Sequence, residues 1–217
     1  MDQLNSFDRI APYYDRLARI VFNNSIKEAQ FSLLSDITTS SSILVLGGGT
    51  GTWLNQLLTI NRDCQIYYVE ASSKMITLAR RGIVDADRVH FIHGTEKHIP
   101  SLSYDALITF FYLDMFSDNQ LRKLVSCLQP HLKLNSKWLV VDFVNTKIWH
   151  AILLRIMFFF FRCIGAISNS KLPDWEGTLN DASYQVVGTG SFFADFIQAR
   201  IYVKKENLYS QPAGIEI

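Results

Sequence analysis

The chain is poor in cysteine, and the cysteines that it has form no pattern. Cys64, Cys127 and Cys163 are the only three among 217 residues, they lie far apart, and no C-x-x-C motif is present. An odd number of cysteines at such spacing predicts free thiols in a reducing compartment rather than a disulfide framework or a zinc site. We therefore expect a cytoplasmic location.

A marked excess of charge is absent as well. The formal net charge is +1 at pH 7, and charged residues make up 19% of the chain. The basic pairs Arg80-Arg81 and Lys204-Lys205 are interpreted as solvated ends of secondary-structure elements. Because a protein that binds nucleic acid usually carries a basic patch, we expect no nucleic-acid partner.

Three further features are missing. The N-terminus lacks the basic and apolar regions of a signal peptide. No G-x-S-x-G elbow supports hydrolase chemistry. His90 and His93 would point to opposite faces of a strand, and with His98 they still lack an acidic or cysteine partner. We therefore expect no metal site.

The most informative feature that is present is an apolar run that ends in glycines. Residues 43–46 read Ile-Leu-Val-Leu, and then come Gly47, Gly48, Gly49 and Gly51 before helix-forming residues resume. Glycine is needed where the backbone takes a positive φ or approaches a ligand closely. Amides at the start of a following helix favour a negatively charged or polar group. The order strand, glycine loop, helix therefore predicts a site for a nucleotide-like small molecule.

Strand-like and helix-like segments alternate along the rest of the chain. Alternation of this kind predicts a mostly parallel sheet with helices on both faces. The link Gly188-Thr189-Gly190 between the last two strands is too short for a crossover, so these strands should form an antiparallel hairpin. The expected fold is α/β, with a doubly wound, seven-stranded, mostly parallel sheet. The strands are expected at about 43–47, 65–69, 89–92, 106–110, 138–143, 184–188 and 196–203.

Helices are expected between these strands. Residues 7–35 predict one or two helices, with Pro12 breaking or kinking the first. Another helix is expected at about 51–60. Ser72 or Ser73 should cap the helix after the second strand, and Ser117-Asp118-Asn119-Gln120 has the form of a capping box.

Glu70 ends the second expected strand, about twenty residues after the glycines. An acidic side chain at this place can accept hydrogen bonds from both ribose hydroxyls of a bound nucleotide, which leaves NAD, FAD and S-adenosylmethionine open. Thr52 stands where the NAD fingerprint has its third glycine, and the spacing is instead G-x-G-x-G. The thioether of Met75 can lie against an adenine face. These two features favour S-adenosylmethionine.

The glycine loop and the segment from Glu70 to Met75 together resemble the class I S-adenosylmethionine-dependent methyltransferases. Residues 7–15 are similar to the helical entry segment of the subfamily that includes the ubiquinone/menaquinone C-methyltransferases. Residues 121–143 look like that subfamily's helix and fifth strand. The chain departs from the family at Val45, where an acidic residue is usual.

The resemblance implies a Rossmann-like fold in one domain over residues 1–217. Residues 1–37 would form a helical lid segment, and residues 148–175 an apolar helix with a substrate-side insertion. The cofactor would be S-adenosyl-L-methionine. The residues implied to bind it lie at the strand ends and in the lid: Gly47, Gly48, Gly49, Gly51, Glu70, Ala71, Met75, Thr95, Glu96, Phe110 and Tyr14.

The region after the fourth strand faces the methyl group in this fold. Phe111 and Tyr112 are therefore expected on the acceptor side, together with Trp149, and aromatic faces can stabilise a sulfonium by cation–π contact. The alternative is that such aromatic residues are core. Asp114 is expected to act as a base or to accept a hydrogen bond from the acceptor; the alternative is that it caps the next loop.

The apolar segment 148–167 allows two interpretations. Arg155 and Arg162 interrupt it, so it is too short for a membrane-spanning helix. One interpretation is a buried helix. The other is a hydrophobic wall for a lipophilic acceptor, or a peripheral contact with a membrane surface.

We therefore expect an enzyme that transfers a methyl group to a small, hydrophobic or aromatic acceptor that is quinone- or lipid-like. The alternative is a protein of the same fold that binds S-adenosylmethionine without turnover. Val45 and Thr95 motivate this alternative, because they depart from the family pattern. The oligomeric state is not predicted.

Overall fold

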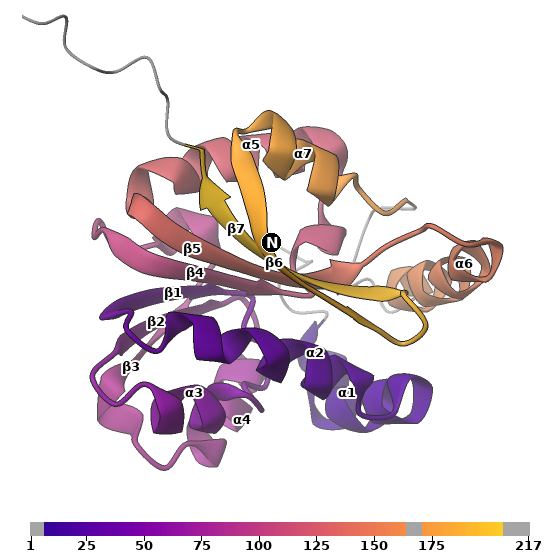
Figure 1. Ribbon diagram of the computed structural model, residues 1–217. Coiled ribbons are helices and arrows are strands. Elements are labelled where there is room, and N and C mark those ends of the chain that lie inside the picture. The colour runs from indigo at the N-terminus through magenta and orange to yellow at the C-terminus, as the bar shows by residue number, and fades with distance from the viewer. Residues whose placement is uncertain (1–6, 164–170, 206–217) are drawn as a thin grey trace, which may run out of the picture.

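The structure of the protein, a computed structural model, describes residues 7–163 and 171–205, except for several side chains of the first helix. The strands form one seven-stranded sheet in the order β3-β2-β1-β4-β5-β7-β6 (Figure 1). The first five are parallel to one another, whereas β7 is antiparallel to both β5 and β6. This confirms the expected fold class. The strands are β1 (Ser42–Leu46), β2 (Gln65–Glu70), β3 (Val89–His93), β4 (Tyr104–Phe110), β5 (Leu132–Phe143), β6 (Tyr184–Phe192) and β7 (Ile197–Lys204).

Helices cover both faces of the sheet (Figure 1). The face covered by α2 and α3 buries Ile43 and Val45 of β1, and the opposite face, covered by α5 and α7, buries Leu44 and Leu46. Alternate residues of a strand point to opposite faces, so a strand buried on both sides must be apolar throughout. The helices are α1 (Phe7–Phe22), α2 (Ser25–Leu34), α3 (Leu54–Ile60), α4 (Ser73–Gly82), α5 (Asp118–Leu128), α6 (Ile148–Cys163) and α7 (Trp175–Asp181).

Both expected helix caps form. The Ser72 hydroxyl accepts a hydrogen bond from the amide of Met75 at the start of α4. Ser117 and Gln120 form the capping box that begins α5. Each cap gives one of the orphan amides of a first helical turn a partner.

The turn of the C-terminal hairpin was wrongly predicted. Gly188 and Gly190 lie inside β6, paired with Ile201 and Ala199, and the chain reverses later, between Phe192 and Ile197. The strand register shifts between Val186 and Gly188, as in a β-bulge. A side chain at Gly188 would collide with Ile201, so the glycine permits close strand packing and not a turn.

Two other expectations also change. Of the two outcomes expected at Pro12, a break or a kink, the break does not occur, because α1 continues to Phe22. The apolar segment forms α6 only as far as Cys163, and residues 164–167 of the expected segment lie outside the described residues. Among the helices in the described part of the chain, none is long and apolar enough to cross a membrane.

Candidate functional site

The glycine loop joins the end of β1 to α3 and opens onto a cavity. Gly47 and Gly49 have φ values of 63° and 64°, in the left-handed region that favours glycine. A side chain at Gly47 would run into the Tyr112 ring, whereas a Cβ at Gly49 would meet no atom within 4 Å. The backbone of Gly49 therefore faces the cavity, and no side chain covers it.

Glu70 ties this loop to the end of β2. Its Oε2 accepts a 2.9 Å hydrogen bond from the Gly49 amide, and its Oε1 accepts one of 2.8 Å from the Ser72 amide. The side chain is almost buried, and burial raises the pKa of Glu70 above its usual value, although the backbone donors oppose the shift. Glu70 thus holds the loop and the start of α4 in place while it borders the cavity.

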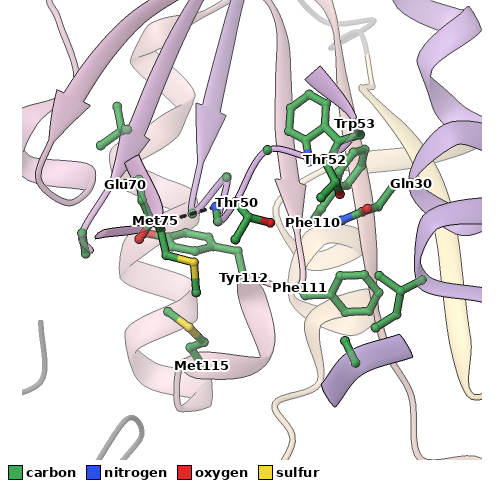
Figure 2. Close-up of a pocket in the computed structure, with 18 of the residues that line it drawn as sticks. Gln30, Thr50, Thr52, Trp53, Glu70, Met75, Phe110, Phe111, Tyr112 and Met115 are labelled. Carbon is green, nitrogen blue, oxygen red and sulfur yellow. Dashed lines mark hydrogen bonds between the residues drawn. The ribbon is translucent and has the colours of Figure 1, made fainter. Parts of the chain in front are cut away.

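The cavity has a volume of about 490 Å³ and lies at the carboxyl ends of β1, β2 and β4. This size is within the range of ligand pockets, roughly 300–1,000 Å³. Figure 2 shows Glu70, Met75 and Tyr112 on one side of it and Gln30, Phe110 and Phe111 on the other. The predicted site residues that line it are Gly47, Gly48, Gly49, Gly51, Glu70, Ala71, Met75, Thr95, Glu96, Phe110, Phe111 and Tyr112.

Two predicted residues, Trp149 and Asp114, are not among those that line the cavity, and the side chain of a third is not described. The backbone of Tyr14 is part of α1, but its side chain is outside the described part of the structure. Trp149 does not line the cavity; its ring packs against His150 and Phe196. Asp114 is also absent from this cavity and borders a second one.

Several residues that line the cavity were not predicted. They come from the end of α1, the following turn and α2, and include Arg19, Asn23 and Gln30. Asp8 of α1 was also missed: its carboxylate accepts hydrogen bonds from the Ser72 hydroxyl and the Lys74 amide. This contact attaches α1 to the start of α4, next to the cavity. No local pattern marks these residues, because their role depends on how α1 packs on the sheet domain.

A second, apolar cavity of about 250 Å³ adjoins the first. The two cavities share the lining residues Ala18, Ile26, Phe111 and Met115. Phe111 has a φ of 52°, unusual for a residue with a side chain, and its amide donates a 2.7 Å hydrogen bond to the Val141 carbonyl. A strained residue held at the end of a central strand is a mark of functional sites.

Asp114 and Asp142 form a buried acidic pair beside the second cavity. Burial raises the pKa of Asp114 to about 7. Burial and the charge of Asp114 raise the pKa of Asp142 well above its usual range. One oxygen of Asp114, Oδ1, is buried without a hydrogen-bond partner. Asp142 gave no signal in the sequence, because it lies within the apolar pattern of β5.

The described residues hold no candidate metal centre. Within 7–163 and 171–205, no group of three or more histidine, cysteine, aspartate or glutamate side chains is placed to bind an ion. His93, one of the three histidines considered above, instead contacts the Ala71 carbonyl at 2.9 Å.

Comparison with known proteins points to one fold. Residues 43–135 match the family described as Methyltransferase domain. No curated protein matches the chain by sequence. The protein has the class I methyltransferase fold. The segment that matches this family contains the glycine loop, Glu70 and the end of β4.

Solved structures share this methyltransferase fold at low sequence identity. A putative O-methyltransferase from Nostoc punctiforme has a TM-score of 0.67 at 18% identity, over 90% of this chain and 59% of that one. A chain from the complex between the Haloferax volcanii Trm112 methyltransferase activator and the putative methyltransferase has a TM-score of 0.68 at 15% identity, over 92% and 98%.

A third structure was determined with ligands. The O-methyltransferase NcsB1 from neocarzinostatin biosynthesis, in complex with S-adenosyl-L-homocysteine and 1,4-dihydroxy-2-naphthoic acid, has a TM-score of 0.59 at 13% identity, over 77% of this chain and 50% of that one. The present methyltransferase-fold chain thus spans about half to three-fifths of the length of the two O-methyltransferases.

Proposed function

We propose that the protein is an S-adenosylmethionine-dependent methyltransferase that acts on a small, hydrophobic or aromatic acceptor. The observation that carries the proposal is the 490 Å³ cavity, where the bare backbone of Gly49 and the carboxylate of Glu70 meet at the ends of adjacent strands. In open α/β sheets, ligands bind at this edge, where the strand order reverses. The matched methyltransferase domain supports the same conclusion.

The residues present fit this cofactor. Gly49 leaves room for the amino-acid part, and Glu70 is placed for the ribose next to it. Met75, Thr95 and Glu96 line the wall where the adenine would lie. When bound, S-adenosylmethionine supplies an electrophilic methyl group on a sulfonium. Phe110 and Phe111 would border that group, and the chain's main task is to hold donor and acceptor in line.

The acceptor would enter from the second cavity, which is apolar on nearly every side. The sequence resembles the ubiquinone/menaquinone C-methyltransferase-like subfamily, whose acceptors are lipid-like, and our proposal extends to that substrate class. In NcsB1, the bound acceptor named in the structure is a dihydroxynaphthoic acid. The residues 1–37 would act as a lid, since α1 borders both cavities.

A peripheral membrane contact is part of the proposal. On α6, Ile148, Ile152 and Phe159 are 87%, 55% and 71% exposed and lie on one side of the helix, with Arg155 and Arg162 beside them. An exposed apolar stripe edged by arginine is typical of helices that lie on an anionic lipid surface. We also retain a cytoplasmic location, because Cys64, Cys127 and Cys163 are free.

Calorimetric titration tests the cofactor. We expect S-adenosylmethionine and S-adenosylhomocysteine to bind the full chain, and NAD to give no heat. Binding of NAD without binding of S-adenosylmethionine would overturn the proposal. Transfer of a labelled methyl group to a panel of phenols and quinols then tests turnover. Tight cofactor binding without transfer to any of them would favour the non-catalytic alternative.

A further inference from the structure

The second cavity contains one ionisable side chain in an apolar wall. The residues that α1 and α2 contribute, Leu17, Val21 and Ile26 among them, are all apolar, and so are those of β5 and α6. Asp114 is the only acidic, basic or histidine side chain among the lining residues. Ionising a carboxyl group in such surroundings costs free energy unless the charge has an ionic or hydrogen-bonding partner.

The backbone of Asp114 is hydrogen-bonded to a second buried carboxylate, that of Asp142. Oδ2 of Asp142 accepts hydrogen bonds from the amides of Leu113 (3.0 Å) and Asp114 (3.2 Å), and Oδ1 accepts one from the Phe143 amide (2.9 Å). All the described donors to Asp142 are therefore backbone groups, and they fix its position. Asp114 keeps Oδ1 buried and without a partner, so one acceptor site beside the cavity is left for a ligand.

Two buried carboxylates this close cannot both be ionised easily, and they titrate as a pair that holds one proton near neutral pH. Burial and backbone amides alone act on the pKa of Asp114, and Asp114 is the one charged group that shifts the pKa of Asp142. The singly charged pair is thus a proton acceptor whose strength is matched to neutral pH.

We propose that Asp114, supported by Asp142, accepts the hydroxyl proton of a lipophilic aromatic alcohol bound in the second cavity, so that its oxygen takes the methyl group. This inference rests on the proposed function. The acceptor O–H bond breaks and its proton moves to Oδ1 of Asp114. The oxygen lone pair forms the new bond to the methyl carbon, and the electrons of the carbon–sulfur bond remain on sulfur. The products are an aryl methyl ether and S-adenosylhomocysteine, and the proton later leaves to solvent.

The position of Phe111 supports this path. Phe111 and Met115 line both cavities, so an acceptor in the second cavity can reach the first past these two side chains. Asp114 lies between them in sequence, in the short 3-10 turn Leu113–Met115 that follows β4. Asp114 thus borders the second cavity next to the two residues that also line the first.

Infrared difference spectra of the full chain without cofactor test the acidic pair independently of activity. We expect a protonated carboxyl band that disappears with an apparent pKa near 7 in the wild-type protein and is absent in Asp114→Asn. Asp87→Asn, an exposed acidic residue remote from the cavity, is the control and should leave the band unchanged. A wild-type spectrum without any carboxyl titrating near neutral pH would overturn the proposal.

Turnover of a defined probe tests the catalytic role. With 4-octylphenol and labelled S-adenosylmethionine, we expect the methyl ether, and no transfer to the matched probe 4-octylaniline. Asp114→Asn should lower kcat by roughly 100-fold or more, with an unchanged cofactor Kd, and should abolish the rise of kcat with pH near 7. Asp142→Asn should move that rise to lower pH without abolishing it, since Asp142 is a positioning residue.

The outcomes separate the two proposals. Failure to bind S-adenosylmethionine contradicts the proposed function. Cofactor binding with methylation of 4-octylaniline, with a ring-carbon product, with no product from 4-octylphenol, or with full activity in Asp114→Asn contradicts this inference alone. Melting of Asp114→Asn at or above the wild-type temperature excludes misfolding as the cause of a loss.

Filling the second cavity tests where the acceptor binds. Leu153 lines this cavity, whereas Val84 is 92% exposed and lines neither cavity. Leu153→Trp should raise the KM for 4-octylphenol at least tenfold and leave the cofactor Kd unchanged. Val84→Trp, the control, should change neither. Equal KM values for the two variants would place the acceptor elsewhere and overturn the proposal.

Discussion

The amide of Gly49 donates a 2.9 Å hydrogen bond to Oε2 of Glu70, which lies 21 residues further along the chain. The two groups come from the ends of adjacent parallel strands, β1 and β2, so the sheet itself brings them together. The same carboxylate also accepts a hydrogen bond from the Ser72 amide. Glu70 therefore has two roles: its hydrogen bonds fix the glycine loop, and it is an acidic group at the edge of the cavity.

Replacement of Glu70 by alanine should weaken binding of S-adenosylmethionine. We expect a loss of about 1–3 kcal/mol, the usual scale for a charge-assisted hydrogen bond, because the variant loses the ribose contact and frees the Gly49 amide. Calorimetry of the wild type and Glu70→Ala measures this. Asp87→Ala, which alters an exposed acidic residue outside the cavity, is the control. An unchanged Kd in Glu70→Ala would show that the ribose lies elsewhere.

A side chain at Gly49 should abolish cofactor binding while the protein stays folded. The space next to Gly49 is open, so valine there would fill the cavity without a collision in the free protein. The φ of 64° adds strain of roughly 1–2 kcal/mol, which thermal melting will show. Gly82→Ala is the matched control, since Gly82 also has open space but lies outside the cavity. Retention of the wild-type Kd by Gly49→Val would contradict this prediction.

The sheet and the glycine loop could be predicted because their signals are local. Residues 43–46 form an apolar run that is buried on both faces in β1, and Gly47 and Gly49 supply the positive φ values that the next turn needs. The position of the hairpin turn was predicted wrongly, because no local signal marks it. Phe193, Ala194 and Asp195 take positive φ values without any glycine, whereas Gly188 serves the packing of two strands. A glycine marks a need for space or for unusual φ, and the sequence alone does not say which.

The acidic pair and the contact of α1 could not be predicted, because they depend on distant parts of the chain. Asp114 and Asp142 meet only when β4 and β5 pair in register. Asp8 reaches Ser72 across 64 residues. The sequence did indicate Asp114 as a candidate base, but its apolar surroundings come from α1 and α6, which no spacing rule connects.

The stability of the free protein should depend on pH through the acidic pair. Because the pKa of Asp114 is raised from 3.8 to about 7, the folded state binds more protons than the unfolded state between these values. The free energy of unfolding should therefore fall as pH rises from about 4 to 7, by on the order of 1 kcal/mol per pH unit. Carboxylates with a lowered pKa, such as Asp105, act in the opposite direction, but near and below pH 3.8, so they do not offset this fall.

Asp114→Asn isolates the contribution of the pair. Urea unfolding at several pH values should show that this variant gains stability relative to the wild type as pH rises to 7, and that the difference disappears near pH 4. Asp105→Asn is the comparison, because the lowered pKa of Asp105 predicts a nearly constant difference from the wild type over this range. A constant difference between Asp114→Asn and the wild type across this range would show that Asp114 has an ordinary pKa.

The apolar stripe on α6 should bind membranes that contain anionic lipid. Phe159 is 71% exposed on this stripe, so Phe159→Glu places a charge in the contact and should reduce sedimentation with phosphatidylserine vesicles severalfold. Val84→Glu is the matched control, because Val84 is 92% exposed but lies in the connection after α4, away from the stripe. Higher salt should weaken binding partially, since Arg155 and Arg162 supply only the electrostatic part. Equal sedimentation of Phe159→Glu and wild-type protein would exclude α6 as the membrane contact, and the stripe would then have to be assigned to another partner.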